Sequence, residues 1–139
     1  MTSLRYAVQE AISGDQFLEL LSNTSLGPRR PLHDKACIEA MAANGNLLVT
    51  AWDGEQLVGV ARSMTDFVFA CYLSDLAVHE AYQKRGIGRE LIHLTQQQLG
   101  PHCKLILLAA PAASEYYGPL GFDKNDRCWL LERHVSVKG

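Results

Sequence analysis

The order of secondary-structure signals predicts an α+β fold, in which a mixed, mostly antiparallel central sheet flanked by helices contains one central βαβ unit. Three apolar runs of strand length follow one another between residues 46 and 79, and the short turns between them favour antiparallel neighbours. The third run leads through an amphipathic helix to another apolar run, which is the order of a parallel crossover. A chain of 139 residues is close to the commonest domain size, so we expect a single domain over 1–139.

The N-terminal segment predicts one strand and two helices. Residues 4–8 have the length and composition of an opening strand. Ser13 is a typical cap for the short helix that follows, in which apolar residues recur at helical spacing. The sequence SLGPRRP, residues 25–31, ends this helix because glycine and proline cannot continue it. A second helix is expected over 32–44, with Gly45 after its end.

The middle of the chain predicts a hairpin and a long strand. Residues 46–64 form two strands that are joined at Asp53-Gly54, a typical two-residue hairpin turn. Residues 66–79 are apolar, aromatic and β-branched, and are long enough to cross a sheet. These segments therefore form the antiparallel part of the predicted sheet.

The C-terminal segments complete the expected order βααβββαβαβ. The helix over 89–99 ends at Gly100-Pro101, and the continuous apolar run 103–110 is expected to be a strand buried on both faces. Residues 113–122, ASEYYGPLGF, predict a short helix and a turn. Residues 128–134, CWLLERH, predict a final strand.

Composition and charge exclude several classes of protein. The chain has 47% apolar and 20% charged residues and a net charge of −2, which is typical of a globular domain and argues against nucleic acid or a membrane surface as partner. No apolar run reaches membrane-spanning length, and residues 1–17 lack the apolar region of a signal peptide. We therefore expect a cytoplasmic protein with reduced, mostly buried thiols, and no metal site, since the four cysteines have no CxxC spacing.

The sequence AYQKRGIG, residues 81–88, places glycines and cations at the start of a helix. Main-chain N–H groups in such a turn, together with a helix N-terminus, form a donor cluster suited to phosphate oxygens. Gly86 and Gly88 allow close approach of a ligand. A Rossmann fingerprint is excluded because Leu91 stands in place of the third glycine, and a nucleotide P-loop is excluded because Gly88 is followed by Arg89-Glu90. The turn therefore predicts an anion site of another kind.

Two motifs in this chain resemble those of the GNAT acyltransferases. LAVHEAYQKRGIGRELI, residues 76–92, is similar to the family's central motif, with Gln83, Gly86 and Gly88 at the positions of Gln/Arg-x-x-Gly-x-Gly/Ala. About thirty residues later, ASEYYGPLGF resembles the family's Ala-x-x-Phe-Tyr-x-x-x-Gly-Phe, with Tyr116 in place of the common Phe. The expected order of elements agrees with the family's fold. The resemblance is strong over about residues 70–125 and implies an acetyl-coenzyme A-dependent acetyltransferase.

The resemblance also implies which residues hold acetyl-coenzyme A. The backbone of the strand at 76–78 would hold the pantetheine arm and the acyl group, and the turn at 83–89 would hold the pyrophosphate. Many relatives carry an asparagine where this chain has Ala110, so Ser114 or backbone groups are expected to substitute for it. The cofactor-binding residues are thus expected to be Leu76, Ala77, Val78, Gln83, Lys84, Arg85, Gly86, Ile87, Gly88, Arg89, Ser114 and Tyr117.

The chemistry of acetyl transfer needs an acid, a base and a charge-stabilising donor. By family match, Tyr117 is the candidate general acid for the departing thiolate, since a phenol has a reference pKa of about 10 against about 8.5 for a thiol. The Val78 N–H could stabilise a developing oxyanion. Asp75 is the nearest carboxylate that could act as a base, although strand alternation places it on the face opposite Tyr72 and Ser74 unless a bulge intervenes. Asp75 could equally bind a neighbouring loop.

The acceptor site is expected in the segment between the two N-terminal helices and along the far rim of the sheet. Arg29, Arg30 and His33 would favour a small-molecule amine that also carries a carboxylate or phosphate, with Tyr72 and Ser74 beside it; an exposed basic loop is the alternative. Two other functions stay open: a protein acetyltransferase acting on an N-terminus or lysine, and a non-catalytic acyl-coenzyme A-binding module. A homodimer is possible, with the C-terminal strand as its contact.

Overall fold

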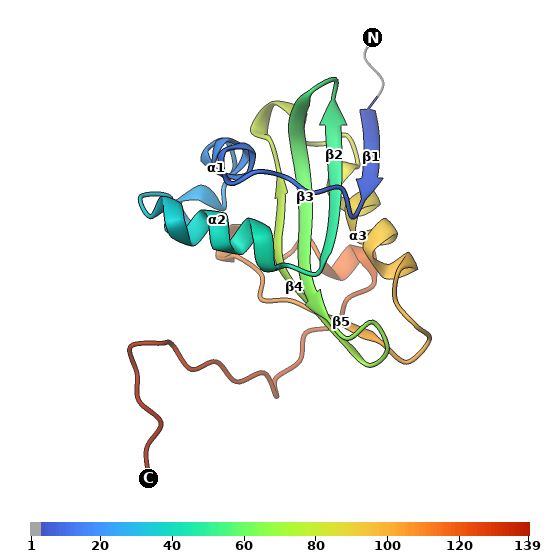
Figure 1. The fold of residues 1–139 in the computed structure, drawn as a ribbon. Coiled ribbons are helices and arrows are strands. Elements are labelled where there is room, and N and C mark those ends of the chain that lie inside the picture. Colours follow the sequence, from blue (N-terminus) through green and yellow to red (C-terminus); the bar gives the residue numbers. More distant parts are fainter. Residues whose placement is uncertain (1–3) are drawn as a thin grey trace.

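The computed structural model describes residues 4–139 and contains a five-stranded sheet of order β1-β2-β3-β4-β5 (Figure 1). Strands β1 (Leu4–Val8), β2 (Leu47–Asp53), β3 (Gln56–Thr65) and β4 (Ala70–Val78) pair antiparallel in succession. Strand β5 (Lys104–Ile106) pairs parallel with β4. The mixed, mostly antiparallel sheet with one βαβ unit is confirmed.

Three helices cover the two faces of the sheet. Helices α1 (Gly14–Ser22) and α2 (Lys35–Asn44) lie on one face, and α3 (Ile87–Gln97) lies on the other (Figure 1). Ser13 caps α1 through a reciprocal capping box with Gln16, as its position predicted. Each face has its own apolar core, with Phe17 central to the first and Leu91 to the second, both fully buried. In the described part of the chain, no helix is long and apolar enough to cross a bilayer.

Strand β4 has two halves with different surroundings. Cys71 and Tyr72 pair with β3 on one side and with β5 on the other, and Ala70 before them pairs with β5. Beyond Tyr72 only the β3 side is paired, because β5 ends after three residues. The second half of β4 thus has one free edge, and this edge faces the start of α3 and the residues that follow β5.

A β-bulge at Ser74 changes the face on which the later side chains of β4 lie. Arg62 pairs with Asp75 and Ser63 pairs with Leu73, so that Ser74 is the extra residue. Leu73 and Leu76 consequently pack into the same core, on the α3 side, while Asp75 contacts Arg62 on the opposite face. Simple alternation, which put Asp75 on the face opposite Ser74, is therefore wrong, and the alternative of a bulge is confirmed: both side chains contact Arg62.

Several element boundaries differ from the sequence-based expectations. The hairpin turn is Gly54-Glu55, since Asp53 still pairs with Gln56, and Gly54 has a φ of 59°. Strand β4 begins only at Ala70, because the Asp66 carboxylate binds the N–H groups of Val68, Phe69 and Ala70 in a turn. The segment 113–122 contains one residue of a first 3₁₀ turn (Pro111–Ala113) and all of a second (Gly118–Leu120) rather than a short α-helix.

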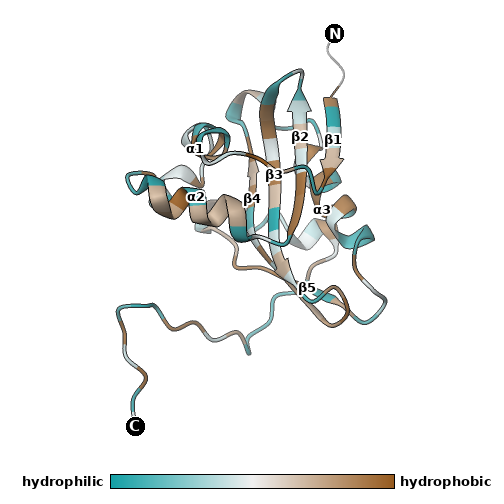
Figure 2. Cartoon of the chain, in the orientation of Figure 1, coloured by the Kyte–Doolittle hydropathy of each residue, from teal (hydrophilic) through white to brown (hydrophobic). Residues whose placement is uncertain are grey.

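The largest differences lie at the C-terminus. The predicted double-faced strand over 103–110 is a three-residue edge strand, and Lys104 and Ile106 are exposed. The predicted final strand at 128–134 is an exposed tail that leaves the body of the protein (Figure 1), and a turn interrupts it where the Val135 N–H donates to the Glu132 carbonyl at 3.0 Å. Figure 2 shows apolar stretches along this tail, so its pattern is strand-like although it pairs with nothing in the described chain. Of the four free cysteines only Cys71 is buried, contrary to the expectation of mostly buried thiols.

Candidate functional site

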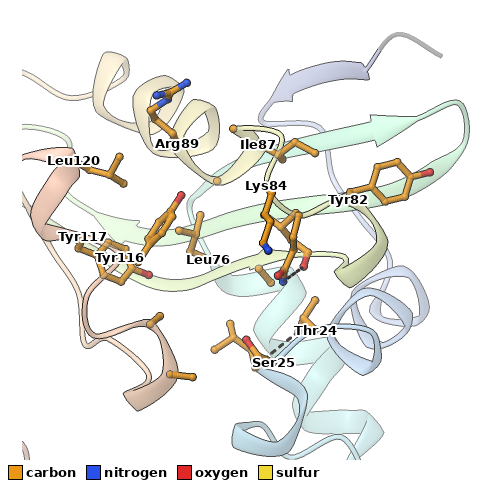
Figure 3. A pocket seen from close by; sticks show the side chains of 18 residues that line it. Thr24, Ser25, Leu76, Tyr82, Lys84, Ile87, Arg89, Tyr116, Tyr117 and Leu120 are labelled. Carbon is orange, nitrogen blue, oxygen red and sulfur yellow. Dashed lines mark hydrogen bonds between the residues drawn. The ribbon is translucent and has the colours of Figure 1, made fainter. Parts of the chain in front are cut away.

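One cavity of about 600 Å³ occupies the wedge beside the free half of β4. Four segments line it: the loop after α1, the end of β4, the turn that enters α3, and the residues after β5. Figure 3 shows Tyr116 and Tyr117 on one side and Thr24, Ser25 and Lys84 on the other. The lining residues are Thr24, Ser25, Leu26, Leu76, Ala77, Val78, Tyr82, Gln83, Lys84, Gly86, Ile87, Gly88, Arg89, Ala112, Ala113, Tyr116, Tyr117 and Leu120.

The backbone of β4 presents hydrogen-bonding groups to this cavity. The His79 N–H donates to the Val58 carbonyl at 2.8 Å, which fixes the alternation of the antiparallel β3–β4 ladder. In this ladder Ala77 bonds to β3, whereas the main-chain groups of Leu76 and Val78 point away from β3 to the free edge. The cavity therefore has strand-like donors and acceptors along one wall.

The turn that enters α3 supplies a second group of donors. Lys84 and Gly86 have φ values of 64° and 78°, in the left-handed region, which bends the chain sharply between β4 and α3. Gly86 is the N-cap and offers no side-chain cap, and the first intrahelical hydrogen bond runs from the Glu90 N–H to the Gly86 carbonyl. The N–H groups at the start of α3 thus have no helical acceptor and are available to an anion.

Gly88 brings the start of α3 close to Tyr116. A methyl group at Gly88 would lie 2.6 Å from the Tyr116 hydroxyl, so any side chain there would force the ring to move. Gly88 itself is buried, although it lines the cavity. Gly88 therefore allows α3 to approach Tyr116 closely, whereas Gly86 allows the backbone to adopt its left-handed conformation.

Tyr117 is held by aromatic contacts at the wall of the cavity. Its ring packs edge-to-face against Phe122, with centroids 5.5 Å apart, and against Tyr116 at 5.1 Å. Burial raises the pKa of Tyr117 above its usual value of 10, and the neighbouring Tyr116 adds to this. The phenol is consequently protonated at neutral pH and can act only as a proton donor there.

Asp75 lies next to the cavity but is fully buried between two arginines. Its two oxygens each accept a hydrogen bond of 2.6 Å, one from the Arg30 Nε and one from the Arg62 Nε. Arg30 also donates to the Ser74 carbonyl at 2.9 Å, and Arg62 donates to the Met41 carbonyl at 3.0 Å. This ion-pair cluster joins the loop after α1 to β3 and β4, and so it holds the loop that supplies Thr24, Ser25 and Leu26 to the cavity.

The structure brings most of the predicted cofactor residues into one place and separates the predicted acceptor residues from it. Ten of the twelve residues expected at the cofactor line the cavity; the two that do not are Arg85, whose guanidinium lies 5.0 Å over the Tyr82 ring, and exposed Ser114. None of the five residues expected at the acceptor lines it: Arg30 and Ser74 belong to the ion-pair cluster, Arg29 and His33 are exposed, and Tyr72 is half-buried.

Sequence reasoning missed eight of the cavity residues: Thr24, Ser25, Leu26, Tyr82, Ala112, Ala113, Tyr116 and Leu120. Tyr116 lies within the recognised motif, where it stands in place of the family's common Phe, but it was not among the expected site residues. Thr24, Ser25 and Leu26 lie between the two N-terminal helices, in the segment expected to wall the acceptor site. The prediction named the arginines of this segment as binding residues and did not name its small and apolar residues. Tyr82 donates a hydrogen bond from its hydroxyl to the Asp53 carboxylate, which no sequence pattern indicates.

Comparison with known proteins agrees with this geometry. The family model described as an acetyltransferase (GNAT) domain matches residues 28–128. The chain belongs to the GNAT acetyltransferase family. The family resemblance inferred from the two motifs is thereby confirmed, and residues 28–128 include the whole of β4, the turn and Tyr117.

Individual GNAT proteins resemble the chain at different levels. It is 35% identical over 72 residues to the uncharacterised N-acetyltransferase ycf52 of Pyropia yezoensis, covering 50% of this chain and 41% of that protein. It is 28% identical over 120 residues to a ycf52-like N-acetyltransferase of Prochlorococcus marinus, covering 80% and 65%. The chain thus spans less than two thirds of the length of these relatives. An aminoglycoside N-acetyltransferase solved in complex with CoA shares the fold, with a TM-score of 0.69, 14% identity and 97% of each chain covered.

Proposed function

We propose that this GNAT chain is an acetyl-coenzyme A-dependent N-acetyltransferase that acetylates the primary amine of a small molecule. One observation carries the proposal: the outward main-chain groups of Leu76 and Val78 and the free amides at the start of α3 line the same cavity. The first set is suited to an amide-containing arm and the second to a diphosphate. Bound acetyl-coenzyme A would supply an activated acetyl group as a thioester.

The chain's own residues supply two of the three groups that acetyl transfer needs, which are the charge-stabilising donor and the acid. The Val78 N–H, fixed in the β3–β4 ladder, is the donor proposed to stabilise negative charge on the reacting carbonyl oxygen, an effect of about 3–4 kcal/mol for one preorganised donor. Tyr117 is the proposed proton donor to the departing sulfur, and burial keeps its hydroxyl protonated. Lys84 and Arg89, both exposed at the cavity, add positive charge beside the free amides.

Asp75 is proposed to position the loop after α1 and not to act as a base. Both of its oxygens are occupied by arginine donors, and it does not line the cavity. A general base must lie within hydrogen-bond reach of the proton it takes, directly or through one water. The predicted catalytic role of Asp75 is accordingly replaced here by a structural one.

The loop after α1 favours a small acceptor over a protein. Thr24, Ser25 and Leu26 wall the cavity next to β4, and the Arg30–Asp75 pair fixes this loop in place. A protein substrate would need an open groove beside β4 for an extended peptide. The four free cysteines fit a reducing compartment, and we propose the cytoplasm as the location.

The test is a thiol-release assay with acetyl-coenzyme A and a panel of small amines and lysine peptides, for wild type and Tyr117→Phe. We expect turnover with a small amine and a fall in kcat of about 100-fold or more in the variant, the usual contribution of a positioned acid. Tyr6→Phe is the matched control, because Tyr6 is a partly buried tyrosine of β1 outside the cavity and should leave kcat unchanged.

The outcomes separate the three candidate functions. Turnover of peptides alone would show a protein acetyltransferase. A cofactor-induced rise in melting temperature without turnover of any amine would show a binding module. Equal kcat values for wild type and Tyr117→Phe would remove the tyrosine from the mechanism.

A further inference from the structure

The turn between β4 and α3 has few attachments to the rest of the fold. In the described segment 80–86, Tyr82 is the one residue that is not exposed to solvent. Lys84 and Gly86 have left-handed backbones, and a lysine keeps this conformation only where its surroundings impose it. The conformation that offers the free amides of α3 to a ligand must therefore be held from outside the turn.

Tyr82 supplies one attachment, on the N-terminal side of the turn. Its hydroxyl donates a hydrogen bond to the Asp53 carboxylate, and its ring packs edge-to-face against His79, with centroids 5.6 Å apart. Asp53 is the last residue of β2 and is paired with both β1 and β3, so the sheet fixes its position. Figure 3 shows Tyr82 at the end of the cavity opposite Tyr117, with its hydroxyl pointing away from that residue. Tyr82 thus joins the start of the turn to the sheet.

Ile87 supplies the attachment on the other side of the turn. It is the first residue of α3, and its side chain is buried in the core on the α3 face. A methyl group at Gly59 would lie 3.1 Å from the Ile87 Cγ2, so the missing side chain of Gly59 allows Ile87 to lie directly on β3. The segment 83–86 is therefore held between an apolar and a polar anchor, and the polar one depends on a single hydrogen bond.

The charge of Asp53 is unfavourable for the ligand proposed above. A carboxylate that lies one tyrosine ring away from an anion site repels a diphosphate. Among the described residues, none forms an ion pair with Asp53 that would neutralise it. Repulsion and anchoring consequently predict opposite effects on ligand affinity when this carboxylate is removed.

We propose that Tyr82 is a positioning residue, which holds the turn at 83–86 in its anion-binding conformation through the hydrogen bond to Asp53. The inference rests on the proposed function, in which the free amides of α3 bind the diphosphate of coenzyme A. A turn that is ordered before the ligand arrives loses less conformational entropy on binding. Tyr82 therefore increases the affinity for the diphosphate and leaves the transfer step unchanged, because β4 fixes Val78 and aromatic contacts fix Tyr117.

The first experiment compares the binding of coenzyme A and of pantetheine, which lacks the diphosphate, to wild type and Tyr82→Phe by titration calorimetry. Loss of the hydroxyl should weaken coenzyme A binding about tenfold or more, as expected for one hydrogen bond to a charged group, and should leave pantetheine binding unchanged. In the thiol-release assay the KM for acetyl-coenzyme A should rise while kcat stays the same. Equal losses for the two ligands, or no loss for either, would overturn the inference.

The second experiment uses the opposite effects predicted at Asp53. Asp53→Ala removes the acceptor and should weaken coenzyme A binding as much as Tyr82→Phe does, and the double variant should be no weaker than either single variant. Asp53→Asn keeps an oxygen acceptor and loses the charge, so it should bind coenzyme A at least as tightly as wild type. Tighter binding to Asp53→Ala would show that the carboxylate only repels the ligand, which contradicts the inference.

A measurement without ligand separates this inference from the proposed function. The backbone order parameters of the amides at 83–88, from NMR relaxation, should fall in Tyr82→Phe, while those of β2 and β3 stay unchanged. Unchanged order parameters at the turn would overturn the inference even where wild type binds coenzyme A. Failure of wild type to bind coenzyme A would overturn the proposed function, and the order parameters would still decide whether Tyr82 holds the turn.

Discussion

The molecule uses its cations in two ways: one pair lies on the face of β4 that α1 covers, and the other lies beside the free edge of β4. Arg30 and Arg62 are fixed to buried Asp75, with side chains only 20% and 7% exposed. Lys84 and Arg89, at the N-terminus of α3, are exposed, and no ion pair involving either is found in the described chain. The first pair stabilises the walls of the cavity, and the second is available to a ligand.

The difference shows that burial and an opposite charge decide what a cation can do. Sequence reasoning placed Lys84 at an anion site because it lies in the glycine turn before a helix, and it placed Arg30 at the acceptor because it lies in the loop between the two N-terminal helices. The bulge at Ser74 turns the Asp75 carboxylate toward Arg62, and the same carboxylate then takes up Arg30 from a loop 45 residues away. A cation so engaged holds a loop in place and is not free to recruit an anion.

Substitution of the buried carboxylate should have the largest effect. Asp75→Asn would leave Arg30 and Arg62 without a counter-ion, and breaking a buried pair from one side costs about 3–5 kcal/mol. We expect the free energy of unfolding in urea to fall by that amount. The control is Asp15→Asn, in an exposed pair with Lys35, which should change it by less than about 1 kcal/mol. A similar small loss for Asp75→Asn would show that the cluster does not hold the fold together.

Two substitutions at Gly86 should test whether the turn before α3 binds the diphosphate of coenzyme A. Coenzyme A at 100 times its dissociation constant should stabilise wild type by about 2.7 kcal/mol. Gly86→Glu puts a carboxylate beside the free amides and should abolish most of this gain. Gly86→Asn is the control, because asparagine tolerates the φ of 78° and carries no charge, so it should retain a larger share. An unchanged gain in Gly86→Glu would place the diphosphate elsewhere.

The fold was predictable wherever the pattern is local. Ser13 and Gly45 flank helix ends as predicted, whereas α3 ends at Gln97, before the predicted stop at Gly100-Pro101; four of the five strands follow from apolar runs. The extent of β5 was not predictable, because a continuous apolar run does not show how much of it finds a partner. The final strand failed for the same reason: residues 128–134 have strand propensity, and in the described chain nothing pairs with them.

The candidate site was predictable as far as its motifs extend. The turn at 83–89 and Tyr117 carry their own signals, which are glycine spacing and the aromatic motif. Thr24 and Ser25 come from a loop some fifty residues earlier, and only tertiary packing brings them to the cavity. The Ser74 bulge was equally hidden, since one extra residue in a strand leaves no mark in composition. These are the points at which long-range contacts decide the structure.

Neutralising the exposed cations should have the smallest effect. Lys84→Gln and Arg89→Gln should each weaken coenzyme A binding by roughly 0.3–1 kcal/mol at low salt, since a charge near a helix terminus is screened by solvent. Arg85→Gln is the matched control, because Arg85 stacks over Tyr82 and does not line the cavity. Titration calorimetry at two ionic strengths measures this: the wild-type affinity should fall with salt, and that of the Lys84→Gln/Arg89→Gln double variant should fall less. If the double variant keeps the full salt dependence, Lys84 and Arg89 do not face the ligand. The difference in exposure between these two cations and the buried arginines would then have no bearing on coenzyme A binding.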